Sequence, residues 1–198
     1  MKPTHNSKPS RMSRRDFLIK GSSGAASILS PLWAAPLPDG QEQDSLVVAL
    51  MGDPQWGMTP TTPQHVCTAM DDINTLDHAF LVVLGDCVQN KAALFFDYLE
   101  QVVKRSKQTV YSLPGNGDLG AGLAAYSKAT GYPPYYSITV QGIRFIFTGT
   151  TKTTGTHRHI CWMGNKQLEW LKKELASDTE ITTVVFSHPP VFETTWHS

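Results

Sequence analysis

The sequence has 198 residues, of which 40% are hydrophobic, 17 are basic and 17 are acidic, so its formal net charge is zero. This length and apolar content suit a single domain with one core and exclude a disordered chain, while 15 Gly and 13 Pro exclude a coiled coil. A net charge of zero argues against a protein that binds nucleic acid through bulk electrostatics.

The first 35 residues are predicted to be an export signal. They hold six basic residues and one acidic residue, and a weakly apolar run of small residues occupies 21–35. This layout is typical of a signal peptide. Residues 13–20 read Ser-Arg-Arg-Asp-Phe-Leu-Ile-Lys and closely resemble the twin-arginine motif. We therefore predict export by the twin-arginine machinery to the periplasm or the cell exterior, with an uncleaved membrane anchor as the alternative.

The predicted signal hides the charge of the rest of the chain. Residues 36–198 hold 11 basic and 16 acidic residues, a net charge of −5. No stretch in this part reaches about 18 apolar residues, so no membrane span is predicted in it. Its three cysteines form no C-x-x-C pair and are too few for a disulfide framework, so free thiols are predicted at Cys67, Cys87 and Cys161.

A polar linker at 36–44 is predicted to precede one domain at 45–198, in which apolar runs alternate with helical patterns. Short Val-rich runs predict buried strands at 46–51, 79–84, 109–113 and 182–186. The patterns between them predict helices at 63–76, 92–104 and 165–176. The runs 135–140 and 143–148 flank Gln141-Gly142 and predict a hairpin. The sequence therefore predicts a layered α/β fold with at least one antiparallel hairpin.

Residues that can bind metal follow four of the predicted strands directly. Asp53 and Asp86 follow the first two strands, Asn116 follows the third, and His188 follows the last. Ligands in open α/β sheets gather at the carboxyl ends of the strands, so we expect these side chains to meet. Carboxylate, amide and imidazole groups together suit Mn, Fe or Zn. Each residue alone is also ordinary turn chemistry, so the interpretation depends on the joint pattern.

This joint pattern resembles the calcineurin-like metallophosphoesterases over about residues 45–192. The resemblance implies a β-sandwich flanked by helices in a four-layer α/β/β/α order. It also implies hydrolysis of a phosphate mono- or diester by a water that two divalent or trivalent ions, Mn, Fe or Zn, activate. The residues that match the family motifs are Asp53, Gly85, Asp86, Gly115, Asn116, Asp118 and His188.

The resemblance also implies a role for each matching residue. Asp86 bridges the two metals, Asp53 binds the first metal, and Asn116 and His188 bind the second. Gln55 stands where most of the family has His, and it is predicted to be a further ligand through its amide oxygen.

Gly117 stands where the family has the His that acts as general acid or phosphate donor, and glycine can do neither. Loss of such a group costs about 10²–10⁴ in rate. In the family the residue matched by Asp118 orients that His. Asp118 is therefore predicted to be a catalytic residue that has lost its partner.

The last family motif, Gly-His-x-His, is missing after His188. The domain is therefore expected to be truncated at its C-terminal end. His197 follows His188 too closely to occupy that motif. His157 and His159 form an H-x-H pair, and they are either substitute ligands or exposed loop histidines.

Two other functions remain open at this point. The chain can be a non-catalytic metallophosphoesterase-like domain that only folds or binds metal weakly. Residues 115–120 also match the G-x-G-x-x-G motif of dinucleotide-binding proteins, although no acidic residue follows about 20 positions later.

Overall fold

The computed structural model describes residues 26–29, 45–153 and 161–190. The twin-arginine motif, the predicted linker and the histidines His157, His159 and His197 lie outside the described residues. Within the described part of the chain, no helix is long and apolar enough to cross a membrane.

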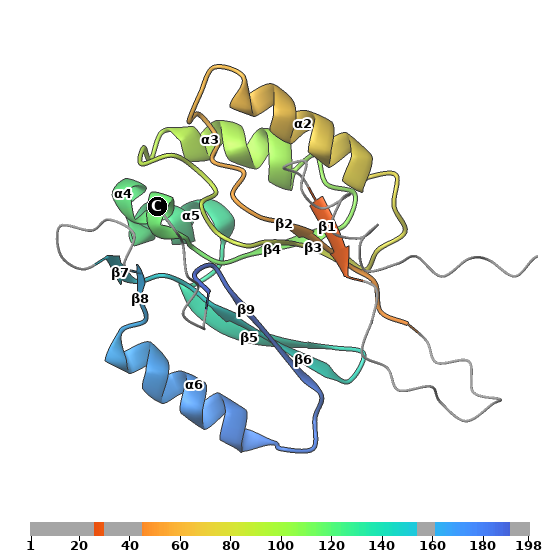
Figure 1. Cartoon of the computed structure of the whole chain (residues 1–198), viewed down its shortest axis with the longest axis vertical. Helices are drawn as coiled ribbons and strands as arrows, with labels where there is room; N and C mark the ends of the chain where they lie inside the picture. Colours follow the sequence, from red (N-terminus) through yellow and green to blue (C-terminus); the bar gives the residue numbers. More distant parts are fainter. Residues whose placement is uncertain (1–25, 30–44, 154–160, 191–198) are drawn as a thin grey trace, which may run out of the picture.

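The first sheet has the strand order β1-β2-β3-β4, and β2, β3 and β4 run parallel (Figure 1). The short strand β1 comes from the predicted export signal and pairs antiparallel with β2. The predicted strands at 46–51, 79–84 and 109–113 are confirmed as β2 (Val48–Met51), β3 (Phe80–Val83) and β4 (Thr109–Ser112), with ends that differ by one or two residues. Strand β1 (Ala26–Leu29) was not predicted from the sequence.

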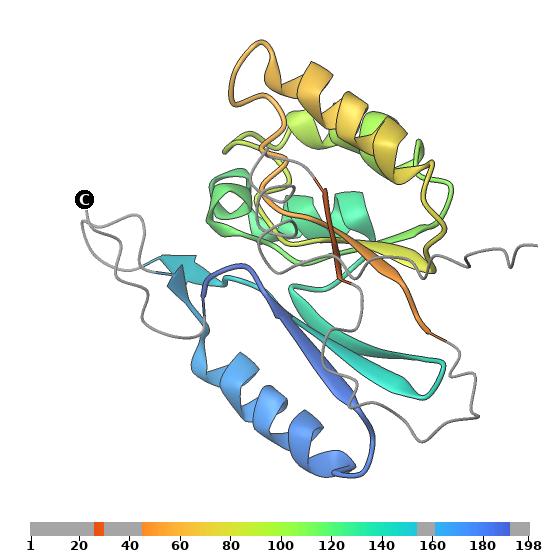
Figure 2. The ribbon, with the colours of Figure 1, turned by 45° about the vertical axis from the view of Figure 1, so that its right-hand side comes forward.

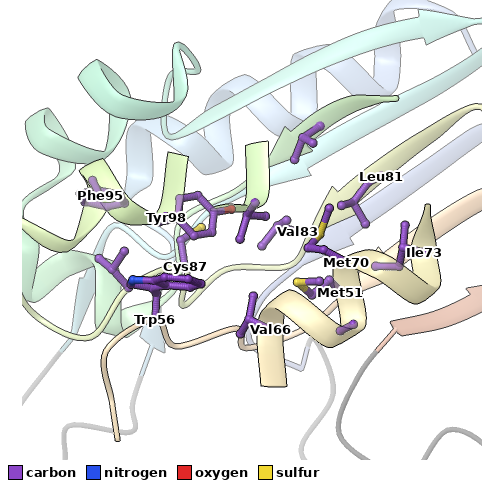
Figure 3. Close-up of a cluster of buried hydrophobic side chains, with 14 of the residues drawn as sticks. Met51, Trp56, Val66, Met70, Ile73, Leu81, Val83, Cys87, Phe95 and Tyr98 are labelled. Carbon is purple, nitrogen blue, oxygen red and sulfur yellow. The ribbon is translucent and has the colours of Figure 1, made fainter. Parts of the chain in front are cut away.

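Strands β2 and β3 are buried on both faces, which explains their continuous apolar runs. On one face the strands pack against helices, with Trp56, Met51, Leu81 and Val83 in one buried cluster (Figure 3). The helices of this layer are α2 (Thr62–Ile73), α3 (Leu94–Tyr98), the π-helix η1 (Leu99–Val103) and α5 (Leu123–Thr130). The predicted helix at 92–104 is thus a short α-helix that continues as a π-helix.

The second sheet has the order β5-β6-β9 and begins with the predicted hairpin. Strands β5 (Tyr135–Val140) and β6 (Ile143–Thr148) have the predicted bounds. Gln141 and Gly142 turn between them with φ values of 49° and 73°, which a two-residue hairpin turn of this type requires. Strand β9 (Thr183–Ser187) runs parallel to β6.

The two sheets face each other across an aromatic core. The rings of Phe80 and Phe145 meet edge to face with centroids 5.2 Å apart, and Phe186 stacks on Phe145. Helix α6 (Asn165–Ser177) covers the outer face of the second sheet (Figures 1 and 2). The predicted four-layer α/β/β/α order is therefore present.

Buried Arg144 of β6 ties α6 to this sheet. Its guanidinium donates hydrogen bonds to the carbonyls of Glu174 (2.7 Å) and Asp178 (2.8 Å) and to the hydroxyls of Ser177 (2.8 Å) and Thr183 (3.1 Å). The carbonyls at the end of a helix have no partner within the helix and carry partial negative charge. The buried guanidinium of Arg144 therefore stabilises the C-terminal end of α6.

The fully buried position of α6 is polar. Leu168 and Leu175 recur at helical spacing but are 38% and 43% exposed. Gln167 is buried instead and donates a hydrogen bond to the carbonyl of Gly149 at 2.9 Å. Trp170 packs against Tyr135 of β5.

The remaining described elements lie near the ends of the strands. Short helix α4 directly follows the loop after β4, and a two-stranded ribbon follows β6. Their bounds are α4 (Asn116–Ala121), β7 (Lys152–Thr153) and β8 (Cys161–Trp162).

Candidate metal centre

Sharp turns place the candidate ligands at the ends of β2 and β3. Asp53, Gln55 and Asp86 have φ values of 49°, 42° and 51°, in the left-handed region that residues other than glycine seldom adopt. Gly85 precedes Asp86 with φ of 84°. Such strained backbone persists only where the surrounding structure enforces it, and it is concentrated at functional sites.

Three of the predicted ligands meet at this edge of the sheets. One ligand atom each from Asp53, Asp86 and His188 lies within 4.8 Å of the other two. Asp86 is buried, His188 is half-buried and Asp53 is exposed. The two aspartates follow strands of the first sheet, whereas His188 follows β9 of the second sheet. The candidate site therefore combines ligand atoms from both sheets.

His188 is oriented so that one ring nitrogen faces the other candidate ligands. Its Nδ1 donates a hydrogen bond to the carbonyl oxygen of Leu84 at 2.8 Å. In the neutral tautomer that this bond selects, the lone pair is on Nε2, and this atom lies 3.0 Å from Oδ1 of Asn116 and 3.5 Å from Oδ1 of Asp86. A hydrogen bond from the other ring nitrogen to a carbonyl commonly orients a metal-binding histidine. Three electron-pair donors thus converge on one place, which is the chemistry that a cation satisfies.

The carboxylate of Asp86 is held from two sides. Its Oδ1 accepts a hydrogen bond from the N–H of Gly117 at 2.6 Å, and its Oδ2 lies 3.4 Å from Nε2 of Gln55. A Cβ at Gly115 would lie 2.2 Å from Oδ1 of Asp86, so only glycine fits there. Gln55 also donates its backbone N–H to the carbonyl of Asp86 at 2.8 Å.

Electrostatics at the site favour a positive charge. Partial burial raises the pKa of the Asp53 carboxyl, His188 lowers it, and the neighbouring Asp86 raises it further. Two carboxylates that share a site repel each other, and a cation between them removes that cost. The donor set of carboxylate, amide and imidazole groups fits a divalent metal such as Mn, Fe or Zn.

Asp118 lies behind the site, and its carboxylate has backbone partners there although Gly117 replaces the family His. Its carboxylate accepts hydrogen bonds from the N–H groups of Gly115 (2.9 Å), Cys87 (3.1 Å) and Val88 (3.1 Å). Burial raises the pKa of Asp118 to about 6, although these amides act in the opposite direction. Its catalytic role stays a prediction.

The structure therefore brings all five predicted metal ligands to one edge, with Gln55 and Asn116 beside the triad. Sequence reasoning missed the backbone groups that hold them: the Leu84 carbonyl and the Gly117 amide. Backbone groups carry no residue signature, so no pattern could have revealed them. Trp56, which directly follows Gln55, is buried in the core.

No protein-family model matches the sequence, and no curated protein matches it. Among solved structures, the chain is similar to a dimetal phosphatase from Danio rerio with a TM-score of 0.57 and 14% sequence identity. The similarity covers 74% of this chain and 70% of that chain. At this identity the likeness shows the fold alone, a layered α/β fold that this chain shares with that dimetal phosphatase. The fold and the triad together are consistent with a site for divalent metals.

Proposed function

We propose that the protein is an exported metal-dependent phosphoesterase that hydrolyses a phosphate mono- or diester. The observation that carries the proposal is the convergence of Asp53, Asp86 and His188 within 4.8 Å at the strand ends of a metallophosphoesterase-like fold. The site would hold two ions, Mn, Fe or Zn. Asp53 and Gln55 would hold one, Asn116 and His188 the other, and Asp86 would lie between them.

Each of these residues has a defined task in that reaction. When bound, the metal ions supply positive charge for the phosphoryl oxygens and lower the pKa of a water. The carboxylates balance the charge of the ions. The bond from the Gly117 N–H to Oδ1 of Asp86 leaves Oδ2 directed toward Gln55, and the Leu84 carbonyl keeps Nε2 of His188 directed at the site.

A second candidate is a metal-binding domain without hydrolytic activity. The observation in its favour is Gly117. This glycine lies beside Asp86 and has no side chain that could protonate a leaving group. A Cβ built there would lie 3.1 Å from Cγ of Asp86, so a larger residue would crowd the carboxylate.

Dinucleotide binding is not favoured by the structure of residues 115–120. A glycine-rich turn binds phosphate through free backbone N–H groups. Here the N–H of Gly115 bonds to Asp118 and the N–H of Gly117 bonds to Asp86. Two carboxylates of the chain thus occupy the amides that a pyrophosphate needs.

The test is hydrolysis of p-nitrophenyl phosphate and of bis-p-nitrophenyl phosphate with added Mn²⁺, Fe²⁺ or Zn²⁺, together with the metal content of the purified protein. We expect activity that D86N abolishes and that D97N, which changes an exposed aspartate on α3, leaves intact. Bound metal without hydrolysis of either ester would support the non-catalytic candidate. Absence of both would reject both proposals.

The export proposal has a separate test. Residues 1–35 fused to a folded reporter should carry it to the periplasm, and replacement of Arg14 and Arg15 by Lys should keep it in the cytoplasm. Equal export of both fusions would contradict the twin-arginine route.

A further inference from the structure

Asp118 joins the two loops that carry Asp86 and Asn116. Its Oδ2 accepts hydrogen bonds from the N–H groups of Cys87 (3.1 Å) and Gly115 (2.9 Å). Its Oδ1 accepts a hydrogen bond from the N–H of Val88 (3.1 Å). The side chain is 0% exposed. The carboxylate therefore ties the backbone directly after Asp86 to the backbone directly before Asn116. We call these three bonds the amide clamp.

The two loops approach each other too closely to be held by ordinary side-chain packing. A Cβ at Gly115 would lie 2.4 Å from the backbone nitrogen of Asp86, and one at Gly85 would lie 2.8 Å from the backbone nitrogen of Gly115. Asp86 itself has a positive φ of 51°. Hydrogen bonds from backbone N–H groups to a buried carboxylate are strong enough to hold such a conformation, because a charged acceptor roughly doubles the strength of a bond.

We propose that Asp118 is a positioning residue that orients Asp86 and Asn116 for metal binding through the amide clamp, without touching metal or substrate. This inference rests on the proposed function. An asparagine at this position keeps the shape but replaces one acceptor oxygen by an NH2 donor, so the side chain can no longer accept from all three amides. Loss of a group that orients metal ligands typically lowers metal affinity about 10- to 100-fold.

The experiment compares the wild-type chain, D118N and D178N. Asp178 is a matched control because its Oδ1 also accepts two backbone N–H groups, from Glu180 at 3.0 Å and Ile181 at 3.3 Å, in an exposed loop after α6. Calorimetry measures Mn²⁺ affinity, and electron paramagnetic resonance reports the geometry around bound Mn²⁺. We expect D118N to bind about 10- to 100-fold more weakly with an altered spectrum, and D178N to match the wild type. Wild-type affinity and spectrum in D118N overturn the proposal.

A second measurement uses the wild-type chain alone, since removal of a buried carboxylate can also unfold a protein. Amide hydrogen exchange of Cys87, Val88 and Gly115 in the metal-free protein should be slow, because the amide clamp protects all three groups. Rapid hydrogen exchange at all three amides would contradict the amide clamp and overturn the proposal. A wild-type chain that binds no Mn²⁺ overturns the proposed function and this role with it, whereas an unchanged D118N overturns the role of Asp118 alone.

Discussion

At the residue scale, the weakest candidate ligand is Gln55. Its side chain lies 3.4 Å from Oδ2 of Asp86, and its backbone adopts a φ of 42°. Histidine tolerates this left-handed conformation better than most residues. An amide oxygen binds Mn, Fe or Zn less tightly than an imidazole nitrogen. The local geometry therefore accepts a stronger ligand.

Q55H should bind Zn²⁺ or Mn²⁺ more tightly than the wild type, because it adds an imidazole beside Asp53 and Asp86. Calorimetric titration of the metal-free protein measures the change. Q64H is the matched control, since Gln64 is exposed on α2 and adds the same group elsewhere. An equal gain in Q64H, or no gain in Q55H, would show that Gln55 does not face the metal.

Cys87 follows the ligand Asp86 but faces the core beside Tyr98 (Figure 3). Complete burial, and then the nearby charge of Asp118, raise the pKa of its thiol well above the usual range. The thiolate is the reactive form of cysteine. Cys87 should therefore be inert at mildly alkaline pH.

The check is labelling with a disulfide reagent in a variant that keeps only Cys87, with Cys67 and Cys161 changed to Ser. We expect labelling only after unfolding, because both burial and the protonated state suppress reaction. The half-buried Cys67, kept alone in a sister variant, is the comparison. Fast labelling of folded Cys87 would mean that the turn after β3 opens readily.

At the element scale, Arg144, Gln167 and Trp170 attach α6 to the second sheet. Leu168 and Leu175 are exposed, while the Arg144 guanidinium reaches the last carbonyls of the helix. By contrast, the hairpin that precedes α6 agrees with the prediction from the sequence. Gln141 and Gly142 have the turn chemistry that the sequence indicated, and both strands have the predicted bounds.

R144A should lower the free energy of unfolding by about 2–3 kcal/mol, because it removes the hydrogen bonds that a buried charged donor makes to Glu174, Ser177 and Asp178. Urea unfolding followed by circular dichroism measures the loss. K173A removes an exposed cation from α6 and should change stability by less than about 0.5 kcal/mol. Equal effects of the two substitutions would indicate that Arg144 acts only through charge.

At the scale of the whole molecule, the candidate site connects the two sheets. Asp53, Asp86 and Asn116 follow strands of the first sheet, and His188 follows β9 of the second. A metal ion bound to ligands from both sheets would link the two sheets. The aromatic contact between Phe80 and Phe145 also holds these sheets together. Metal binding and tertiary stability should therefore be coupled.

Metal should raise the melting temperature of the wild-type chain, and a chelator should reverse the rise. At a free metal concentration a hundredfold above Kd, binding stabilises the folded state by about 2.7 kcal/mol. Differential scanning calorimetry with Mn²⁺ and with EDTA measures the shift. D86N should show no shift, because it loses the carboxylate between the two groups of ligands. A shift of the same size in D86N would place the metal elsewhere.

The sequence by itself determined the order of the main strands and helices from β2 onward, the hairpin and the strand-end positions of Asp53, Asp86, Asn116 and His188. These features depend on local periodicity and turn chemistry, which neighbouring residues carry. Only the tertiary structure decided that His188 from one sheet reaches the aspartates of the other. It also decided that Asp118 binds backbone amides. Both results depend on how two sheets pack and on backbone groups that every residue shares, so no local pattern could reveal them.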